Sequence, residues 1–256
     1  MTTHSYASEH KDVAHAFEHK GLTHAEAHSK AHLKNTIIIS QPDLKYSVFE
    51  HMSRRILKKA YSIMGKDIVF EAFPVERSIA VANAGITDGE LARITGLQSS
   101  YLDLIEVPIP IAFDKVYAYS KEHDFTVDGW QSLKPYKVDH IFGFKLAEQK
   151  SKGLNATKVK TIEQGLNRLR AGRSDVFIGI SGVDCLIRKN SYTDVKALMP
   201  HLDELIMYHY LHKRHKDLAE ELGKVLLKMQ ETGEIALIQK QAKQEFLDQC
   251  EQRTES

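Results

Sequence analysis

The sequence lacks the features that mark several large classes of protein. Its 256 residues include two cysteines, Cys185 and Cys250, too few for a disulfide framework or a four-cysteine metal site. No apolar run approaches the roughly 18 residues that a membrane span needs. Lys and Arg number 35 against 34 Asp and Glu, and this net charge of +1 gives no basis for binding nucleic acid or an anionic membrane. These absences leave a soluble α/β protein.

Motifs for catalysis and targeting are also missing. The chain has no nucleophile elbow, P-loop, paired-histidine zinc motif or dinucleotide-binding glycine motif. We therefore expect no enzyme activity and no cofactor. Residues 1–34 contain no apolar run of the kind found in secretory signals. Either the protein is cytoplasmic or its signal peptide has been removed.

Histidine is concentrated at the start of the chain. Residues 1–34 hold seven of the 14 histidines: His4, His10, His15, His19, His24, His28 and His32. Several are four residues apart, a spacing that would share one helix face and could bind zinc, nickel or copper. The alternative, which we favour, is a solvated extension without a metal site.

From residue 35 onward, strands and helices alternate. The β-branched run at 36–39 predicts a buried strand, and apolar residues at helical spacing over 49–64 predict a helix that ends at Gly65. A strand at 68–70 and a helix from residue 75 follow, which indicates a largely parallel sheet covered on both faces. At 107–111 two prolines interrupt an apolar segment, a pattern that favours an edge strand or a crossover.

A second α/β set begins near residue 116 and continues to a buried strand at 176–180. A strand over 204–210 and helices over about 215–229 and 234–247 then close the chain, with Gly233 between the two helices. The chain thus crosses between the two sets near residue 110 and returns near residue 205.

This order of elements resembles the type II periplasmic solute-binding fold, in particular its family-3 group, the binding components of polar amino-acid ABC transporters. The likeness covers about residues 35–247, and its strength lies in the order and spacing of several short segments. They are Pro-Val-Glu-Arg-Ser at 74–78, Ala-Asn-Ala-Gly at 82–85, Asp-Gly-Glu-Leu-Ala-Arg at 88–93, Ala-Gly-Arg-Ser-Asp-Val at 171–176 and Tyr-His-Tyr-Leu-His-Lys-Arg-His at 208–215.

The resemblance implies an α/β, two-lobed protein in which each lobe is a mostly parallel sheet flanked by helices. Residues 35–112 plus 205–256 would form the first lobe and residues 113–204 the second, after a His-rich extension at 1–34. It also implies a monomer in the periplasm that passes a small anionic ligand to an ABC transporter permease. Lobes joined by two extended crossings are expected to open and close around such a ligand.

Arg93 is the first candidate ligand contact. It follows a predicted strand end, and a guanidinium matches a carboxylate bidentately. The resemblance implies that an arginine near this point holds the carboxylate of the ligand. The alternative is an ion pair with Glu90 or Asp88. Arg77 begins a helix beside Glu76, so a structural ion pair again competes with a ligand contact.

Two further candidates, Tyr46 and Ser47, lie in the loop after the first strand, where pockets commonly gain aromatic walls and hydroxyl donors. Phe49, close by, is expected to pack in the core. In the second lobe the resemblance implies a Gly-Thr pair that meets the ligand carboxylate, and this chain has Lys145 at a helix start instead. Backbone N–H groups there could still meet an anion.

The position that the resemblance assigns to an acidic partner of the ligand ammonium is Ile180, followed by Ser181. An ammonium without an anionic partner would be desolvated at a cost. A carboxylate without an amine therefore fits better than an amino acid, although Asp184 could serve if the register were shifted.

Three other interpretations stay open. A dehydratase-like enzyme of the same fold would need a carboxyl group in the cleft as general acid or base, and Glu90 is the candidate. A sensor would transmit the closing of its lobes to a partner protein. In the third interpretation, the histidines at 1–34 make the protein a metal-binding module. Of the two cysteines, we expect Cys185 to be a buried small residue and Cys250 to be exposed near the chain end.

Overall fold

A computed structural model describes residues 36–44 and 47–252. The chain divides after Thr36, and all that follows concerns the unit that begins at Ile37. The histidine-rich extension at 1–34 and Tyr46 lie outside the described residues.

The first part of the chain forms β1 (Thr36–Pro42), α3 (Val48–Ile63), β2 (Asp67–Phe73), α4 (Val75–Asn83) and β3 (Gly89–Arg93). Helix α3 begins where predicted because Ser47 caps it: its hydroxyl accepts a hydrogen bond from the Glu50 N–H at 3.2 Å. Its buried face includes Phe49, Met52, Ile56, Leu57 and Ala60, at the spacing of one side of a helix.

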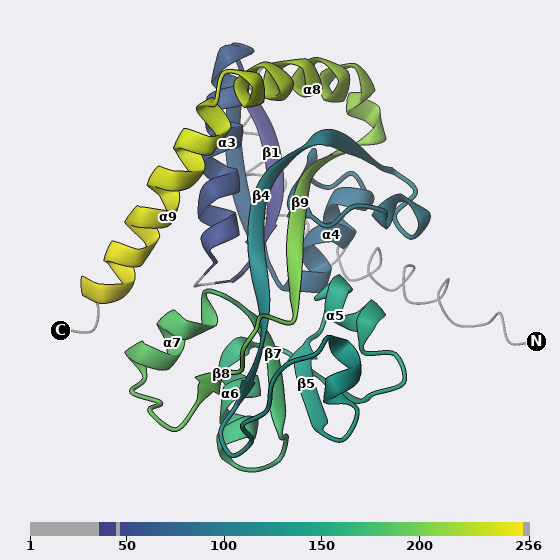
Figure 1. Cartoon of the computed structure of the whole chain (residues 1–256). Helices are drawn as coiled ribbons and strands as arrows, with labels where there is room; N and C mark the ends of the chain where they lie inside the picture. The colour runs from purple at the N-terminus through teal and green to yellow at the C-terminus, as the bar shows by residue number, and fades with distance from the viewer. Residues whose placement is uncertain (1–35, 45–46, 253–256) are drawn as a thin grey trace, which may run out of the picture. The chain divides into compact units, whose positions relative to one another are not determined.

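Two long strands, β4 (Leu104–Ser120) and β9 (Asp203–His212), run side by side in antiparallel pairing through the middle of the molecule (Figure 1). The segment at 107–111, predicted as an edge strand or a crossover, is the first half of β4, which pairs with β9 there and with β7 from Val116 onward. The strand crosses from the first α/β set to the second, as the sequence predicts. The strand accommodates Pro108 and Pro110 through register shifts against β9 between Glu106 and Ala112.

The second α/β set contains β5 (Lys137–Ile141), α5 (Lys145–Lys150), β6 (Asn155–Val159), α6 (Ile162–Arg170), β7 (Val176–Ile180), α7 (Val183–Lys189) and β8 (Lys196–Ala197). Thr161 caps α6 by accepting from the Gln164 N–H at 3.1 Å. Gly165 lets α6 pack closely on β7, because a Cβ there would lie 2.2 Å from the Phe177 ring. Short 3₁₀ turns occupy Leu97–Ser99, Trp130–Leu133 and Lys213–His215.

All of these strands join one mixed sheet in the order β2-β1-β3-β9-β4-β7-β5-β6, with β8 paired to β4. Strands β1 and β3 are parallel, as are β7, β5 and β6, whereas β4 and β9 pair antiparallel with their neighbours. We call β1–β3 with α3, α4, α8 and α9 the first lobe, and β5–β8 with α5–α7 the second. The limits predicted at 112/113 and 204/205 fall inside the two shared strands and stay a prediction.

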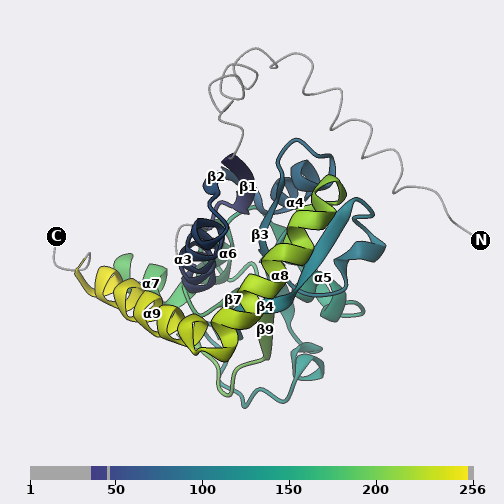
Figure 2. The same cartoon turned by 90° about the horizontal axis from the view of Figure 1, so that it is seen from above.

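Helices α8 (Lys216–Glu231) and α9 (Glu234–Gln252) close the chain against the first lobe. Figure 2 shows α9 continuing past α3 until its end lies beside α7. There Cys250 is bonded to Cys185, with the two Cα atoms 5.6 Å apart. Cys185 is buried as predicted, whereas the prediction that Cys250 is exposed is wrong: 3% of its surface is exposed, because it pairs with Cys185 in a disulfide.

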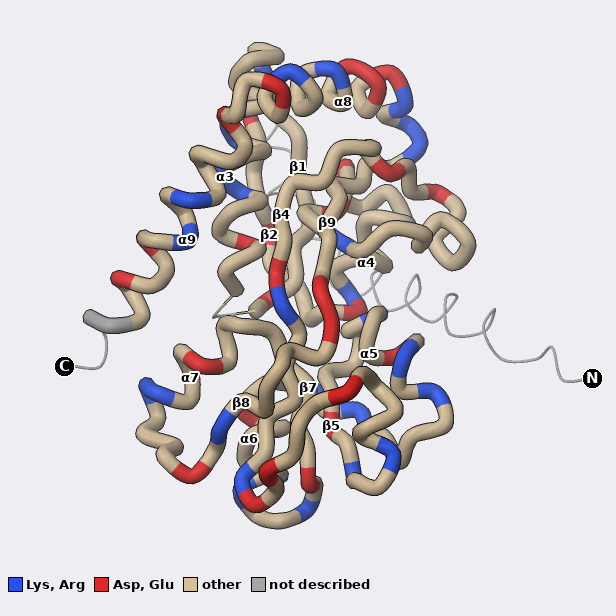
Figure 3. Tube along the Cα trace, viewed as in Figure 1, with Lys and Arg blue, Asp and Glu red and all other residues tan. Residues whose placement is uncertain are grey.

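The core is continuous beneath the shared strands. Ile39 of β1, Ile56 of α3, Ile111 of β4 and Leu222 of α8 are fully buried in one cluster that also reaches Val138 of β5. Lysine, arginine and acidic residues are interspersed along both lobes (Figure 3), in keeping with the small net charge. None of the described helices is long and apolar enough to cross a membrane.

Candidate functional site

A cavity of about 60 Å³ lies where the carboxyl ends of the parallel strands of both lobes come together. The first lobe contributes the segments after β1, β2 and β3, and the second lobe contributes those after β5, β6 and β7. Open α/β sheets bind ligands at such strand ends. The lining residues are Leu44, Phe49, Val75, Arg93, Ile94, Ile141, Gly143, Phe144, Lys145, Leu146, Ile162, Gly179, Ile180, Val183, Leu205 and Met207.

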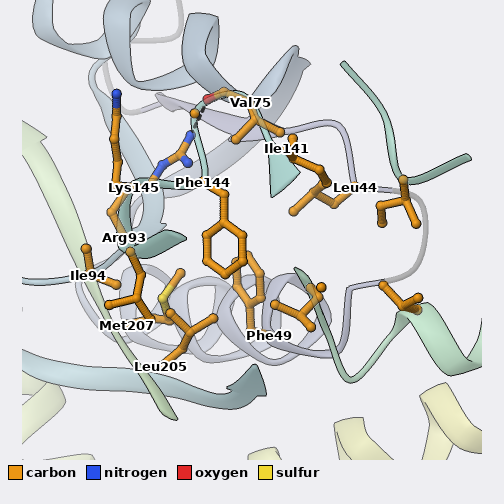
Figure 4. A pocket seen from close by; sticks show the side chains of 16 residues that line it. Leu44, Phe49, Val75, Arg93, Ile94, Ile141, Phe144, Lys145, Leu205 and Met207 are labelled. Atoms are coloured by element: carbon orange, nitrogen blue, oxygen red, sulfur yellow. Dashed lines mark hydrogen bonds between the residues drawn. The ribbon is translucent and has the colours of Figure 1, made fainter. Parts of the chain in front are cut away.

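This cavity is apolar at its centre. Phe144 extends from the loop before α5 and Phe49 from α3, toward one another, with Met207 and Leu205 beside them (Figure 4). Among the described residues that line the cavity, the polar side chains are those of Arg93 and Lys145. The site therefore combines an apolar interior with two cations.

Arg93 is buried and already holds two partners. Its Nε donates to Glu90 Oε1 at 2.7 Å, and its Nη2 donates to the Val75 carbonyl at 2.6 Å, the bond dashed in Figure 4. The other Glu90 oxygen accepts hydrogen bonds from the hydroxyls of Ser40 and Ser78, at 2.7 and 2.6 Å. The structure thus contains the ion pair that the sequence offers as an alternative, and it also places Arg93 in the cavity wall.

Burial raises the pKa of the two acidic groups that interact with Arg93. Burial raises the pKa of Glu90, although the Arg93 guanidinium and the two hydroxyls act in the opposite direction. Burial also raises the pKa of Glu50 well above its ordinary range, and Glu50 Oε1 has no hydrogen-bond partner among the described residues. Sequence reasoning missed Glu50, because its position in the first turn of α3 reads as an ordinary capping acid.

Lys145 lies at the edge of the cavity and joins the two lobes. Its Nζ forms an ion pair with Glu76 of α4 at 2.6 Å, and Glu76 also accepts from the Tyr101 hydroxyl at 2.8 Å. Burial disfavours the ammonium form, but the hydrogen bonds to Glu76 and Tyr101 outweigh it and raise the pKa of Lys145. Close backbone packing supports this contact, since a Cβ on Gly143 would lie 2.7 Å from the Glu76 nitrogen.

The remaining predicted residues lie elsewhere. Ser47 caps α3 and lines a neighbouring polar cavity of about 260 Å³. Ser181 donates to Asp114 at 2.5 Å and lines a third cavity, of about 460 Å³, on the side of α7 and α9. Arg77 is exposed on α4, with its guanidinium 5.9 Å from the centre of the Phe73 ring. Of the seven predicted ligand contacts, the structure brings Arg93 and Lys145 together at the apolar cavity, with Glu90 directly behind Arg93.

The described residues contain no group of three or more histidine, cysteine or acidic side chains placed to hold a metal ion. The metal hypothesis concerned the histidines at 1–34, which lie outside those residues.

Comparison with known structures finds the same fold in several binding proteins. An ancestral arginine-binding protein bound to glutamine superposes with a TM-score of 0.65 at 16% identity, covering 81% of this chain and 97% of that one. The fold is that of the periplasmic solute-binding proteins. An amino-acid ABC transporter substrate-binding protein, AbpA of Streptococcus pneumoniae, bound to L-arginine, gives 0.66 at 14% identity over 83% of this chain and 96% of its own.

This solute-binding fold also occurs in a similar structure with a different role. A histidine kinase sensor domain with similarity to periplasmic binding proteins gives a TM-score of 0.67 at 16% identity, covering 80% and 95% of the two chains. An uncharacterized protein of Shewanella oneidensis is 26% identical over 217 residues, 82% of each chain. No family model matches the chain.

Proposed function

We propose that the protein is an extracytoplasmic, non-enzymatic solute-binding protein. It captures a small carboxylate-bearing ligand between its lobes and delivers it to an ABC transporter permease. The observation that carries this proposal is the position of Arg93: its guanidinium lies in the wall of a cavity built by both lobes at the ends of their parallel strands. A ligand that touches both lobes favours the closed state through its differential affinity.

The Arg93–Glu90 pair is compatible with this role. A ligand carboxylate near Arg93 would add a second negative charge beside Glu90, and burial already favours the protonated form of Glu90 by raising its pKa. Glu90 can then take up a proton while Arg93 turns its charge toward the ligand. We therefore expect a carboxylate to bind more tightly as the pH is lowered, as long as the ligand itself stays ionised.

Glu90 argues for binding rather than catalysis. The dehydratase-like alternative needs a carboxyl group exposed to the ligand, and Glu90 is fully buried behind Arg93 with both oxygens hydrogen-bonded. The sensor interpretation keeps some support from the similar kinase sensor domain. A sensor would bind the same class of ligand. Binding of the protein to a permease would therefore distinguish a transport protein from a sensor.

The test is a thermal-shift screen with mono- and dicarboxylates, amino acids and Zn²⁺. A ligand at about 100 times its Kd stabilises by about 2.7 kcal/mol, or about 5–10 °C in a domain of this size. We expect a carboxylate to raise the Tm of the wild type and not that of the Arg93→Gln/Glu90→Gln variant. The double substitution is used because Arg93→Ala alone leaves a buried carboxylate unpaired. If no carboxylate shifts the wild type, the proposal fails.

A further inference from the structure

We infer that the ligand is a short aliphatic monocarboxylate with no amino group, and that Phe49 and Phe144 set its length. This inference rests on the proposed function and specifies the chemistry of the same cavity. It differs from the amino acids named for the similar binding proteins.

The lining gives the first argument. Beyond Arg93 and Lys145, the side chains that face the cavity are aliphatic, aromatic or methionine. A hydroxyl, amide or second charge on the ligand body would lose its water there and find no hydrogen-bond partner among these side chains. A methylene group placed there instead leaves water and raises the affinity about fourfold.

The absence of an anion in the described lining gives the second argument. An α-ammonium group would need a carboxylate beside the ligand, and Ile180 occupies the end of β7, with 7% of its surface exposed. Ser181 turns to Asp114 on the other side, and Asp184, the alternative partner, lines that same third cavity. Two acids interact with Arg93: Glu90, which is fully paired, and Glu50, which lines the neighbouring polar cavity and whose pKa is raised by burial.

Size gives the third argument. A volume of about 60 Å³ is far below the roughly 300–1,000 Å³ of pockets for drug-sized molecules. The ring of Phe49 is buried, and the ring of Phe144 lies next to it from the second lobe (Figure 4). Since both rings project into the space, removing one should lengthen the ligand that fits.

The experiment measures binding by calorimetry for unbranched carboxylates from acetate to heptanoate. Their 2-amino counterparts and the alcohols of equal chain length are the comparison series. For the wild type we expect affinity to rise about fourfold per methylene until the cavity is full. The 2-amino compounds should bind at least about tenfold more weakly.

Phe144→Ala should move the optimum to longer chains, a gain that a merely structural defect would not produce. Phe144→Leu is the milder variant should the alanine protein fold poorly, and it should move the optimum less. Phe142→Ala is the matched control, because Phe142 lies two residues away, is 48% exposed and does not line the cavity. Its ligand profile should equal that of the wild type.

The outcomes separate the two proposals. If polar amino acids bind and the carboxylate series does not, this inference is wrong while binding in the cleft stands. If alcohols bind as tightly as carboxylates, the role of Arg93 as anchor is wrong while the apolar ligand body stands. If nothing binds, the proposed function fails together with the inference. If the chain length that binds most tightly is unchanged in both Phe144 variants, the Phe144 ring does not limit the length of the ligand.

Discussion

Helices α7 and α9 meet through a disulfide, whereas α4 and the start of α5 meet through an ion pair. In the first case Cys250, on a helix held to α3 by ion pairs of Glu245 with His51 and Arg55, is bonded to Cys185 of the second lobe. In the second case Lys145 of the second lobe contacts Glu76 of the first. Both contacts join the two lobes. The first is a covalent bond, and the second is an ion pair whose partners can each be hydrated by water instead.

The difference indicates where the cleft can open. A disulfide holds its two helices together unless it is reduced, while a partly exposed ion pair contributes little and exchanges readily with solvent. Strands β4 and β9 also run through both lobes. We therefore expect the lobes to separate at Glu76–Lys145 and to stay together at Cys185–Cys250, so that a ligand enters past α4 and α5.

The largest expected effect comes from removing the covalent contact. The cysteines are 65 residues apart, and closing a loop of that length stabilises by about 4 kcal/mol through the entropy of the unfolded chain. The Cys185→Ser/Cys250→Ser variant should lose about this much free energy of unfolding in a urea titration. The wild type with added reductant should match the variant. If the oxidised wild type and the variant have equal free energies of unfolding, the disulfide between Cys185 and Cys250 does not stabilise the fold.

The second effect concerns the backbone beneath the ion pair. Gly143 has φ of +87° and lies against Glu76, so Gly143→Ala should cost about 2–3 kcal/mol from both conformational strain and the close contact. Gly153 is a matched control, because its φ is +86° and a Cβ there would meet nothing within 4 Å. Gly153→Ala should cost about 1 kcal/mol. Equal losses in the two variants would show that the contact with Glu76 contributes nothing.

Local sequence signals account for the ends of several helices. The N-caps at Ser47 and Thr161 and the break at Gly65 act within a few residues, and α3 and α6 begin and α3 ends where those signals lie. The prolines of β4 lie in the half that pairs with β9, before pairing with β7 begins at Val116, and the register against β9 shifts around them.

The contacts between the lobes could not be predicted in the same way. Two cysteines 65 residues apart carry no local sign of pairing, although an extracytoplasmic location would favour it. Arg93 and Glu90 are three residues apart, so their ion pair was among the alternatives. That both side chains are buried could not be predicted. The two serines that donate hydrogen bonds to Glu90 come from β1 and α4, so their contacts depend on the tertiary fold. Likewise, the apolar character of the cavity emerges only when six strand ends meet.

The smallest effect concerns the ion pair itself. Lys145→Met should lower the free energy of unfolding by about 1 kcal/mol at neutral pH, and less at high salt. The raised pKa of Lys145 means that its contribution is present below the pKa it has in the unfolded chain and is lost as the pH rises through the higher folded value. The wild type and Lys145→Met should therefore converge in strong alkali.

On the acid side the relevant carboxyl group is Glu148, which pairs with both Lys145 and Lys158. Burial opposes the shift, but Lys158, the Gly143 N–H and Lys145 lower the pKa of Glu148, so its contribution is lost as the pH falls through that lowered value. Lys158→Met is the control, because Lys158 pairs with Glu148 inside the second lobe and does not cross the cleft. Both variants should flatten the acid limb of stability against pH. Lys145→Met alone should speed ligand release in stopped-flow measurements, since it alone weakens the side at which we expect the cleft to open. Equal release rates in the two variants would place the opening elsewhere.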